Sequence, residues 1–151
     1  MAAFKFRAAA ALEMRVRAEE LATRDLGEAR AALERSERAL TDSLAALDAT
    51  LAQGAGAVSD PGLSIWYRNW ITRHRHEIGR RRAMVVERQA AVDAGMARVY
   101  AAHRDVRVLE RLRDRLHEAW MLAERRREQK ELNWLGSVRH ALRAASQEDV
   151  T

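Results

Sequence analysis

Residues 71–106 have the sequence ITRHRHEIGRRRAMVVERQAAVDAGMARVYAAHRDV, and this stretch decides the fold. A β-branched apolar residue occurs at every seventh position: Ile71, Ile78, Val85, Val92, Val99 and Val106. Most of the positions between them are charged residues or alanine. This period is typical of an α-helix that packs along one seam against another helix. The stretch therefore predicts a long helix in a coiled coil.

The N-terminal third of the chain has the same period. Leucines occur at Leu12, Leu26, Leu33, Leu40 and Leu47, and Glu19 interrupts the series. A small side chain follows three residues after each of the last four leucines: Ala29, Ser36, Ser43 and Thr50. Leucine alternating with a small residue predicts a narrow seam that a partner helix can approach closely. We therefore predict a first helix over about residues 4–52.

A single break separates the two periodic segments. Residues 53–62, QGAGAVSDPG, contain three glycines and the sole proline, Pro61. Glycine after a periodic segment ends a helix, and proline in a first turn begins one. We predict a loop at about 53–62, a second helix at about 63–145 and, because the loop is short, antiparallel helices. The expected fold is all-α, a single antiparallel coiled-coil hairpin over residues 1–151.

Beyond residue 106 the apolar pattern changes phase and then stops. Leu109, Leu112 and Leu116 continue it, and residues 124–131 contain no apolar side chain. About thirty C-terminal residues should extend beyond the first helix, given a rise of about 1.5 Å per residue. Their apolar side chains offer one alternative role, self-association through a set of four residues: Trp120, Leu132, Trp134 and Leu135.

The composition excludes several other classes of protein. Seven glycines and one proline in 151 residues leave little turn chemistry for a sheet. The absence of cysteine excludes disulfides and thiolate metal sites. The longest run without a charged residue, 49–59, is far shorter than the ~20 apolar residues of a membrane-spanning helix. We therefore expect a cytoplasmic protein without a membrane span.

No catalytic or cofactor-binding motif is present in the sequence. The glycines at 54 and 56 are not followed by the Gly-Lys-Ser/Thr of a phosphate-binding loop. His74 and Glu77 have the spacing of half a metal site, but nothing supplies the other ligands. We therefore predict a protein that is not an enzyme and that binds neither a metal nor a cofactor.

Arginines and aromatic residues gather just after the loop. Six arginines lie between residues 68 and 82, close to Trp66, Tyr67 and Trp70. Such a cluster can bind nucleic acid, but on a helix these arginines point in several directions. Nucleic-acid binding is therefore a less favoured alternative, membrane-surface binding is less favoured still, and attraction to acidic surfaces stays open. Trp66 and Trp70 indicate either a protein-binding face or a plug at the hairpin tip.

Four short segments give the chain a resemblance to a known family. They are Phe4-Lys5-Phe6-Arg7, Leu26-Gly27-Glu28-Ala29-Arg30, the aromatic stretch from Trp66 to Ile78, and Glu128-Gln129-Lys130-Glu131-Leu132. In this order and spacing they resemble FliJ, the coiled-coil stalk of the flagellar type III export apparatus. The resemblance covers most of the chain.

The resemblance implies a non-enzymatic stalk, similar to the two-helix coiled coil of the rotary ATPase γ subunit. The implied partners are the hexameric export ATPase, whose assembly or activity the stalk promotes, the export gate protein FlhA, and export chaperones. The implied location is the cytoplasmic face of the inner membrane. The stalk of a virulence type III secretion system is an alternative, although the opening Phe4-Lys5-Phe6-Arg7 favours the flagellar system.

The resemblance also implies a gate-binding stripe on the second helix near the loop. Carried over by position, the candidates are Trp70, His74, Glu77 and Arg81. The companion positions on the first helix are Ala39, Ser43, Ala46 and Thr50. Trp70 keeps the aromatic character of the family, whereas His74 and Glu77 stand where the family can have leucine and alanine. The end formed by the two termini is implied to enter the ATPase pore.

Overall fold

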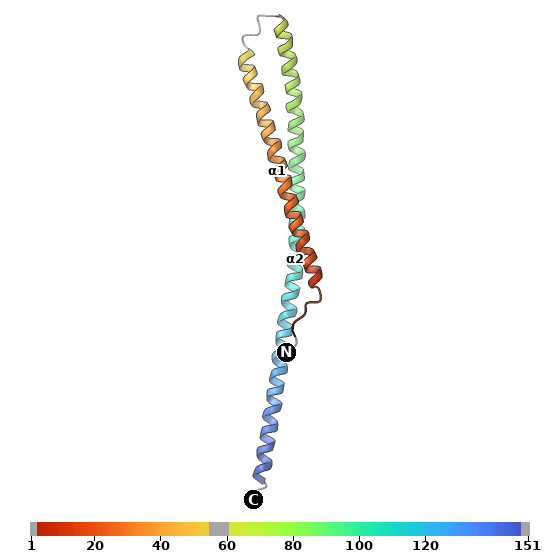
Figure 1. Cartoon of the computed structure of the whole chain (residues 1–151), viewed down its shortest axis with the longest axis vertical. Coiled ribbons are helices and arrows are strands. Elements are labelled where there is room, and N and C mark those ends of the chain that lie inside the picture. The colour runs from red at the N-terminus through yellow and green to blue at the C-terminus, as the bar shows by residue number, and fades with distance from the viewer. Residues whose placement is uncertain (1–2, 55–60, 149–151) are drawn as a thin grey trace. The chain divides into compact units, whose positions relative to one another are not determined.

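Two long helices form almost all of the described protein. The computed structural model describes residues 3–54 and 61–148, with side chains described to residue 143. The helices are α1 (Ala9–Gln53) and α2 (Pro61–Glu148), shown in Figure 1, and these ranges contain no strand. The chain is therefore all-α, an antiparallel coiled-coil hairpin of two long helices, which confirms the fold class predicted from the heptads.

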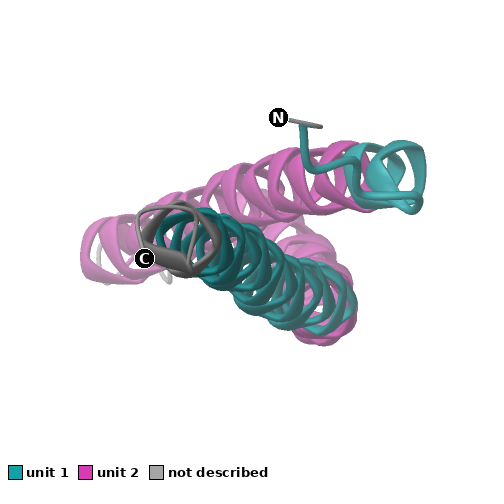
Figure 2. Ribbon diagram, turned by 90° about the horizontal axis from the view of Figure 1, so that it is seen from below, with its two compact units in different colours: residues 1–14, 105–151 teal, residues 15–104 magenta. Residues whose placement is uncertain are grey.

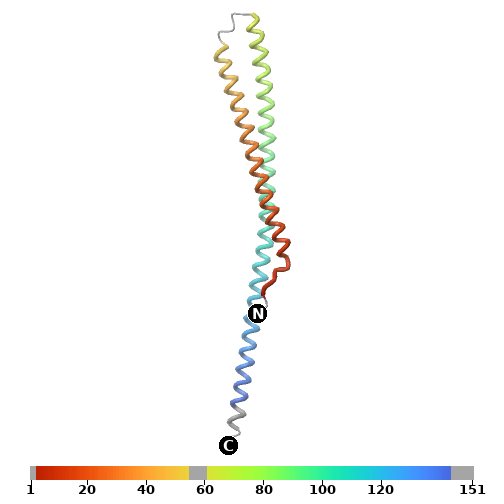
Figure 3. The backbone as a smooth tube through the Cα atoms, in the orientation of Figure 1, coloured from red at the N-terminus to blue at the C-terminus, as the bar shows by residue number. Residues whose placement is uncertain are grey.

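The chain divides into two compact units, coloured separately in Figure 2. We call Arg15–Arg104 the hairpin unit, and Met1–Met14 with Asp105–Thr151 the terminal unit. The backbone trace in Figure 3 shows α1 and α2 side by side in the hairpin unit. Contacts between the two helices there are Glu19 with His103, Leu26 with Gly95, Ala39 with Arg81, and Thr50 with Tyr67. Partners on α2 thus descend as residue numbers rise along α1, so the helices are antiparallel.

The apolar core consists of side chains at the heptad positions. The buried hydrophobic residues of the described part are Leu26, Ile78, Val92 and Val106, and each is one of the heptad positions. The remaining heptad positions are half-buried: Leu12, Leu33, Leu40, Leu47, Ile71, Val85 and Val99. A two-helix interface covers each side chain from one side, which explains why so few are fully buried.

Small residues allow the helices to approach each other. A Cβ atom on Gly95 would lie 3.1 Å from Leu26 Cδ1 and 3.6 Å from Leu26 Cα, so glycine is the residue that leaves room for this leucine. Ser43 is buried in the interface, and its hydroxyl donates to the Ala39 carbonyl of its own helix at 2.9 Å. A small polar side chain can therefore lie in this seam without an unsatisfied hydroxyl.

Tyr67 covers the C-terminal end of α1. Its hydroxyl donates to the Thr50 carbonyl at 3.4 Å, and a Cβ atom on Gly54 would lie 2.1 Å from the tyrosine ring. Because the last carbonyls of a helix lack intrahelical donors, this contact satisfies one of them. A tryptophan plug at the tip, one of the two alternatives for this cluster, is not provided by Trp66, which is 63% exposed. Residues 55–60 of the predicted loop lie outside the described residues.

The first helix begins at Ala9 and not near residue 4 as predicted. Residues 3–6 are non-helical, and a turn follows in which the Ala9 N–H donates to the Phe6 carbonyl at 3.2 Å. Phe4 and Phe6 are half-buried, whereas Lys5 and Arg7 are exposed. This alternation places both phenylalanines on one side of an extended segment, whereas a helix would separate them by about 200°. The second helix begins at Pro61, two residues before the predicted start.

The last part of α2 has an exposed surface. From Met121 to Arg143 every side chain is exposed except Glu124 and Val138, which are half-buried. The exposed set includes Trp134, at 66%, and Leu142. Neither α1 nor α2, as far as they are described, has a stretch long and apolar enough to cross a membrane.

Candidate functional site

The four candidate gate-binding residues form one stripe on α2 in the hairpin unit. Their spacing of four, three and four residues places Trp70, His74, Glu77 and Arg81 on the same helix face. All four are half-buried, because they flank the seam positions Ile71 and Ile78.

The half of the stripe nearer the loop consists of two aromatic rings. The Trp70 and His74 ring centroids are 3.8 Å apart, and the ring planes are inclined by 32°. His74 Nδ1 is buried and has no hydrogen-bond partner among the described residues. An unpaired buried nitrogen costs free energy, and in this arrangement it is not exposed to an incoming partner.

The other half of the stripe is an ion-paired network. Arg81 Nε donates to Glu77 Oε1 at 3.0 Å, and Arg80 donates to the second carboxylate oxygen of Glu77. The hydrogen bond from Arg81, followed by that from Arg80, lowers the pKa of Glu77 below 4.5. Glu77 is therefore ionised at neutral pH, and two guanidinium groups hold it in place.

Arg81 also joins the stripe to the companion positions on α1. Its Nη1 donates to the Ala39 carbonyl at 2.9 Å. Ser43 is buried, Ala46 is exposed, and the Thr50 hydroxyl donates to the Ala46 carbonyl at 3.0 Å. The companion positions therefore contribute small side chains and backbone, whereas the large side chains come from α2.

A groove of about 360 Å³ lies between the helices at the Arg81 end of the stripe. The lining residues on α1 are Ala32, Arg35, Ser36 and Ala39, and those on α2 are Glu77, Arg81, Met84 and Arg88. Sequence reasoning missed Met84 as a lining residue. Met84 lies three residues after Arg81, so helical spacing places the two on the same side of α2, and this spacing could have predicted its role.

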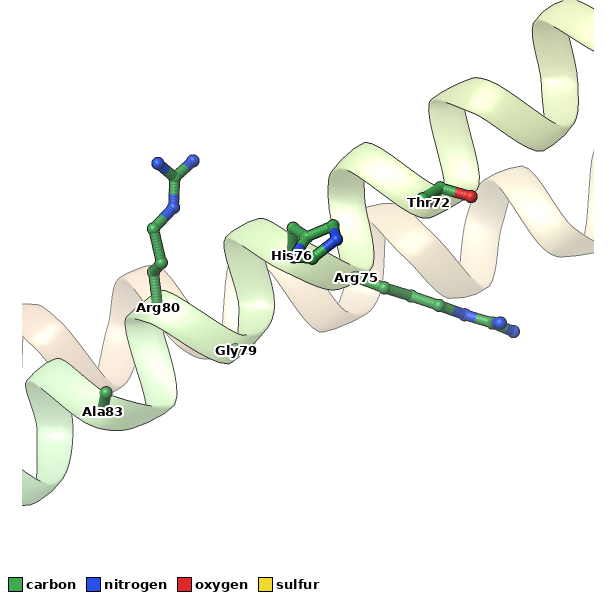
Figure 4. Close-up of a pocket in the computed structure, with 6 residues that line it drawn as sticks. All are labelled: Thr72, Arg75, His76, Gly79, Arg80 and Ala83. Atoms are coloured by element: carbon green, nitrogen blue, oxygen red, sulfur yellow. The ribbon is translucent and has the colours of Figure 1, made fainter.

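A second, shallow hollow of about 630 Å³ lies on the surface of α2 and is shown in Figure 4. Gly79 leaves the helix backbone bare at its centre, and Arg75 and Arg80 extend away from each other on its two sides. His76 lies between them. This surface is basic. It contains none of the four stripe residues, and the residue that it shares with the ion-paired network of Glu77 is Arg80.

His74 and Glu77 have the spacing of half a metal site, but the structure uses Glu77 differently. Both Glu77 oxygens accept hydrogen bonds from arginines. In the described ranges, no group of three or more histidine and carboxylate side chains is placed to hold a metal ion.

These features define a class of protein: an all-α chain of two long helices paired along a heptad seam. The chain belongs to the FliJ family, because the family model described as Flagellar FliJ protein matches residues 5–133. No curated protein and no solved structure matches the chain. Membership in this non-catalytic family makes the chain a component of the flagellar type III export apparatus.

Proposed function

We propose that the chain is a stalk that binds the hexameric export ATPase, promotes its assembly or activity and links it to the export gate protein FlhA. Its place in the cell is then the cytoplasmic face of the inner membrane. The observation that carries the gate-linking role is the stripe Trp70, His74, Glu77 and Arg81, joined to α1 by the hydrogen bond from Arg81 to Ala39. Export chaperones are further partners in this proposal.

The chemistry of the stripe suits a protein partner. Tryptophan and arginine are the residue types most enriched at the centres of protein interfaces. The stacked rings of Trp70 and His74 offer apolar area. The Glu77–Arg81 pair is held in one arrangement before binding, which reduces the entropy lost on association.

The ATPase role is tested by the hydrolysis rate of the flagellar export ATPase with and without the full-length chain at physiological salt. We expect stimulation that saturates near one chain per hexamer. An ATPase shown to assemble but unaffected by the chain would overturn this role. Replacing it with the ATPase of a virulence secretion system distinguishes the two export systems, because the cognate enzyme should respond at the lower concentration.

The gate role is tested by the affinity of the chain for the cytoplasmic part of FlhA, measured by calorimetry. Trp70→Ala should weaken binding about tenfold or more, as expected for a tryptophan at an interface centre. Trp134→Ala is the matched control, because Trp134 is an exposed tryptophan of the same helix and lies outside the hairpin unit that carries the stripe. Equal losses in the two variants, with helicity unchanged, would exclude the stripe as the gate-binding surface.

The hollow in Figure 4 favours a second candidate function, binding to nucleic acid or another acidic surface through Arg75, His76 and Arg80. Binding of a fluorescent DNA duplex that persists at physiological salt would support it. Binding lost as salt is raised to that level would reflect charge alone.

A further inference from the structure

The N-terminal segment and α2 enclose an apolar groove in the terminal unit. The groove has a volume of about 500 Å³, within the range of about 300–1,000 Å³ that is typical of ligand pockets. One wall is formed by the alternating residues of the extended segment, Phe4, Phe6 and Ala8. The other wall is formed by α2 at positions 112, 116 and 120, which share one face of the helix.

An aromatic cluster holds the N-terminal segment against α2. The Phe4 ring meets the His117 ring edge-on, with centroids 5.1 Å apart, and lies 6.0 Å from the Trp120 ring. The His117 and Trp120 rings stack on each other at 6.0 Å. Such pairs contribute beyond the area that they bury, so the wall that carries Phe6 is held in place before any ligand arrives.

The helix wall of the groove is open to a ligand. Leu112 is 42% exposed and Leu116 is 46% exposed, although each is a large apolar side chain. The extended segment covers them only in part, because Phe4, Phe6 and Ala8 are its half-buried side chains, whereas Lys5 and Arg7 are exposed at the rim of the groove. A large apolar side chain from another molecule would bury this remaining area.

The charge of the groove indicates the chemistry of its ligand. Its lining contains six apolar residues and two bases, Lys5 and Arg7, and no acidic residue. Both bases are exposed, so they can pair with carboxylates beside an inserted side chain. A second copy of the chain is less suitable, because its exposed apolar stretch at residues 132–142 carries Arg139 and no acid.

We propose that this N-terminal groove binds a segment of a partner protein in which a large apolar side chain is flanked by acidic residues. The apolar side chain inserts between Phe6 and Leu116, and the carboxylates pair with Lys5 and Arg7. This proposal is independent of the gate-binding stripe and of the ATPase role.

The test uses the full-length chain, labelled with ¹⁵N, and two capped pentapeptides. One is Glu-Asp-Leu-Glu-Asp and the other is its uncharged counterpart Gln-Asn-Leu-Gln-Asn. We expect the acidic peptide to shift the amide signals of residues 4–8 and 112–120 and the Trp120 indole signal. The uncharged peptide should bind at the same place about threefold more weakly, because exposed ion pairs contribute modestly.

Two sets of variants test the basic residues and the apolar wall of the groove separately. The double substitution Lys5→Gln and Arg7→Gln should remove the preference for the acidic peptide and leave the binding of the uncharged one unchanged. Leu116→Ser should weaken both peptides at least threefold, whereas Leu132→Ser, a leucine on the same helix outside the groove, should change neither.

Three results would overturn the proposal. They are the absence of saturable shifts at several millimolar peptide, shifts centred elsewhere, such as around Arg75 and Arg80, and undiminished binding to the Leu116→Ser variant. The experiment contains neither ATPase nor gate protein, so its failure would leave the stalk proposal unaffected. Failure of the stalk proposal would likewise leave the groove unaffected.

Discussion

The stripe near the loop and the N-terminal groove are both places where another part of the chain lies against α2, but they are built differently. At the stripe the neighbour is a helix, and the contact is closed by Arg81, which reaches the Ala39 carbonyl. At the groove the neighbour is an extended segment, and the contact is made by the Phe4 ring against His117 and Trp120.

The difference follows from the period of the side chains. A helix directs every third or fourth residue toward its neighbour and fills a seam with a line of leucines and valines. An extended segment directs every second residue toward its neighbour, so Phe4 and Phe6 both reach α2 within three residues. Short extended segments cover a helix incompletely, which leaves Leu112 and Leu116 partly open. The helix-on-helix contact therefore favours stability, and the segment-on-helix contact leaves room for a ligand.

The largest expected effect is at the helix-on-helix seam. Val92→Asp places a charge at a position that is 5% exposed and removes an apolar contact, at a cost of about 3 kcal/mol. With so thin a core, the helical signal in circular dichroism should melt at a much lower temperature than in the wild type. Val86→Asp is the control, because Val86 is 69% exposed and should change stability by less than about 0.5 kcal/mol. Equal melting temperatures of the two variants would show that Val92 does not lie in the seam between the helices.

Phe4→Ala should have the next largest effect, and a local one. Loss of the ring from the aromatic cluster should cost about 1–2 kcal/mol of local stability. Hydrogen exchange at the amides of residues 5–8 should become faster, while the global melting temperature stays close to that of the wild type. Lys5→Ala removes an exposed neighbour and should leave exchange unchanged. Unchanged exchange in Phe4→Ala would show that the ring does not hold the segment.

Alanine substitutions at two glycines of α2 test how closely the helices approach each other at the seam. Gly79→Ala should stabilise the chain by about 0.8–1 kcal/mol, because alanine favours a helix and nothing lies within 4 Å of the new Cβ atom. Gly95→Ala should give less than half of this gain, since its methyl group would approach Leu26 Cδ1 at 3.1 Å. Thermal melts of the two single variants and the double variant measure both effects. A full gain at Gly95 would mean that the helices are not in close contact there.

The smallest expected effect is the pH dependence of the Glu77 network. Arg81 and Arg80 lower the pKa of Glu77 below 4.5, so its contribution to stability is present above pH 4.5 and is lost as pH falls through the lowered pKa. Glu77→Gln should remove this part of the acid dependence. Melting temperatures of the variant and the wild type, measured from neutral pH to well below pH 4.5, should differ most at neutral pH and converge in acid. A constant difference would contradict the ion-pair explanation.

Much of the fold follows from the heptad period and from the glycines and the proline that separate the two helices. The heptads predict two helices, and the short loop predicts their antiparallel pairing. Pro61 marks the start of α2, which the structure places two residues before the predicted position. Sequence reasoning failed at residues 4–8, which it assigned to the first helix. The alternation Phe-Lys-Phe-Arg was visible, but four residues are too few to distinguish an extended segment from a helix end without knowing what the phenylalanines contact.

The candidate stripe was only partly predictable. Spacing alone places Trp70, His74, Glu77 and Arg81 on one face of α2. The sequence does not show that Arg81 reaches Ala39, because that contact joins residues 42 positions apart and depends on the register of two helices. Nor does it show that Tyr67, and not Trp66, covers the end of α1.

The sequence by itself therefore determined what is local: an all-α chain, two long helices, the break between them and the face that each helix turns toward the other. These properties arise from interactions between residues a few positions apart and from a hydrophobic period that repeats along the chain. Only the tertiary structure decided which residues meet across the pair, where the chain departs from the helix at its N-terminus, and that this departure leaves an apolar groove. Those features depend on contacts between distant segments, where side-chain shape and register select among arrangements that the local sequence permits equally.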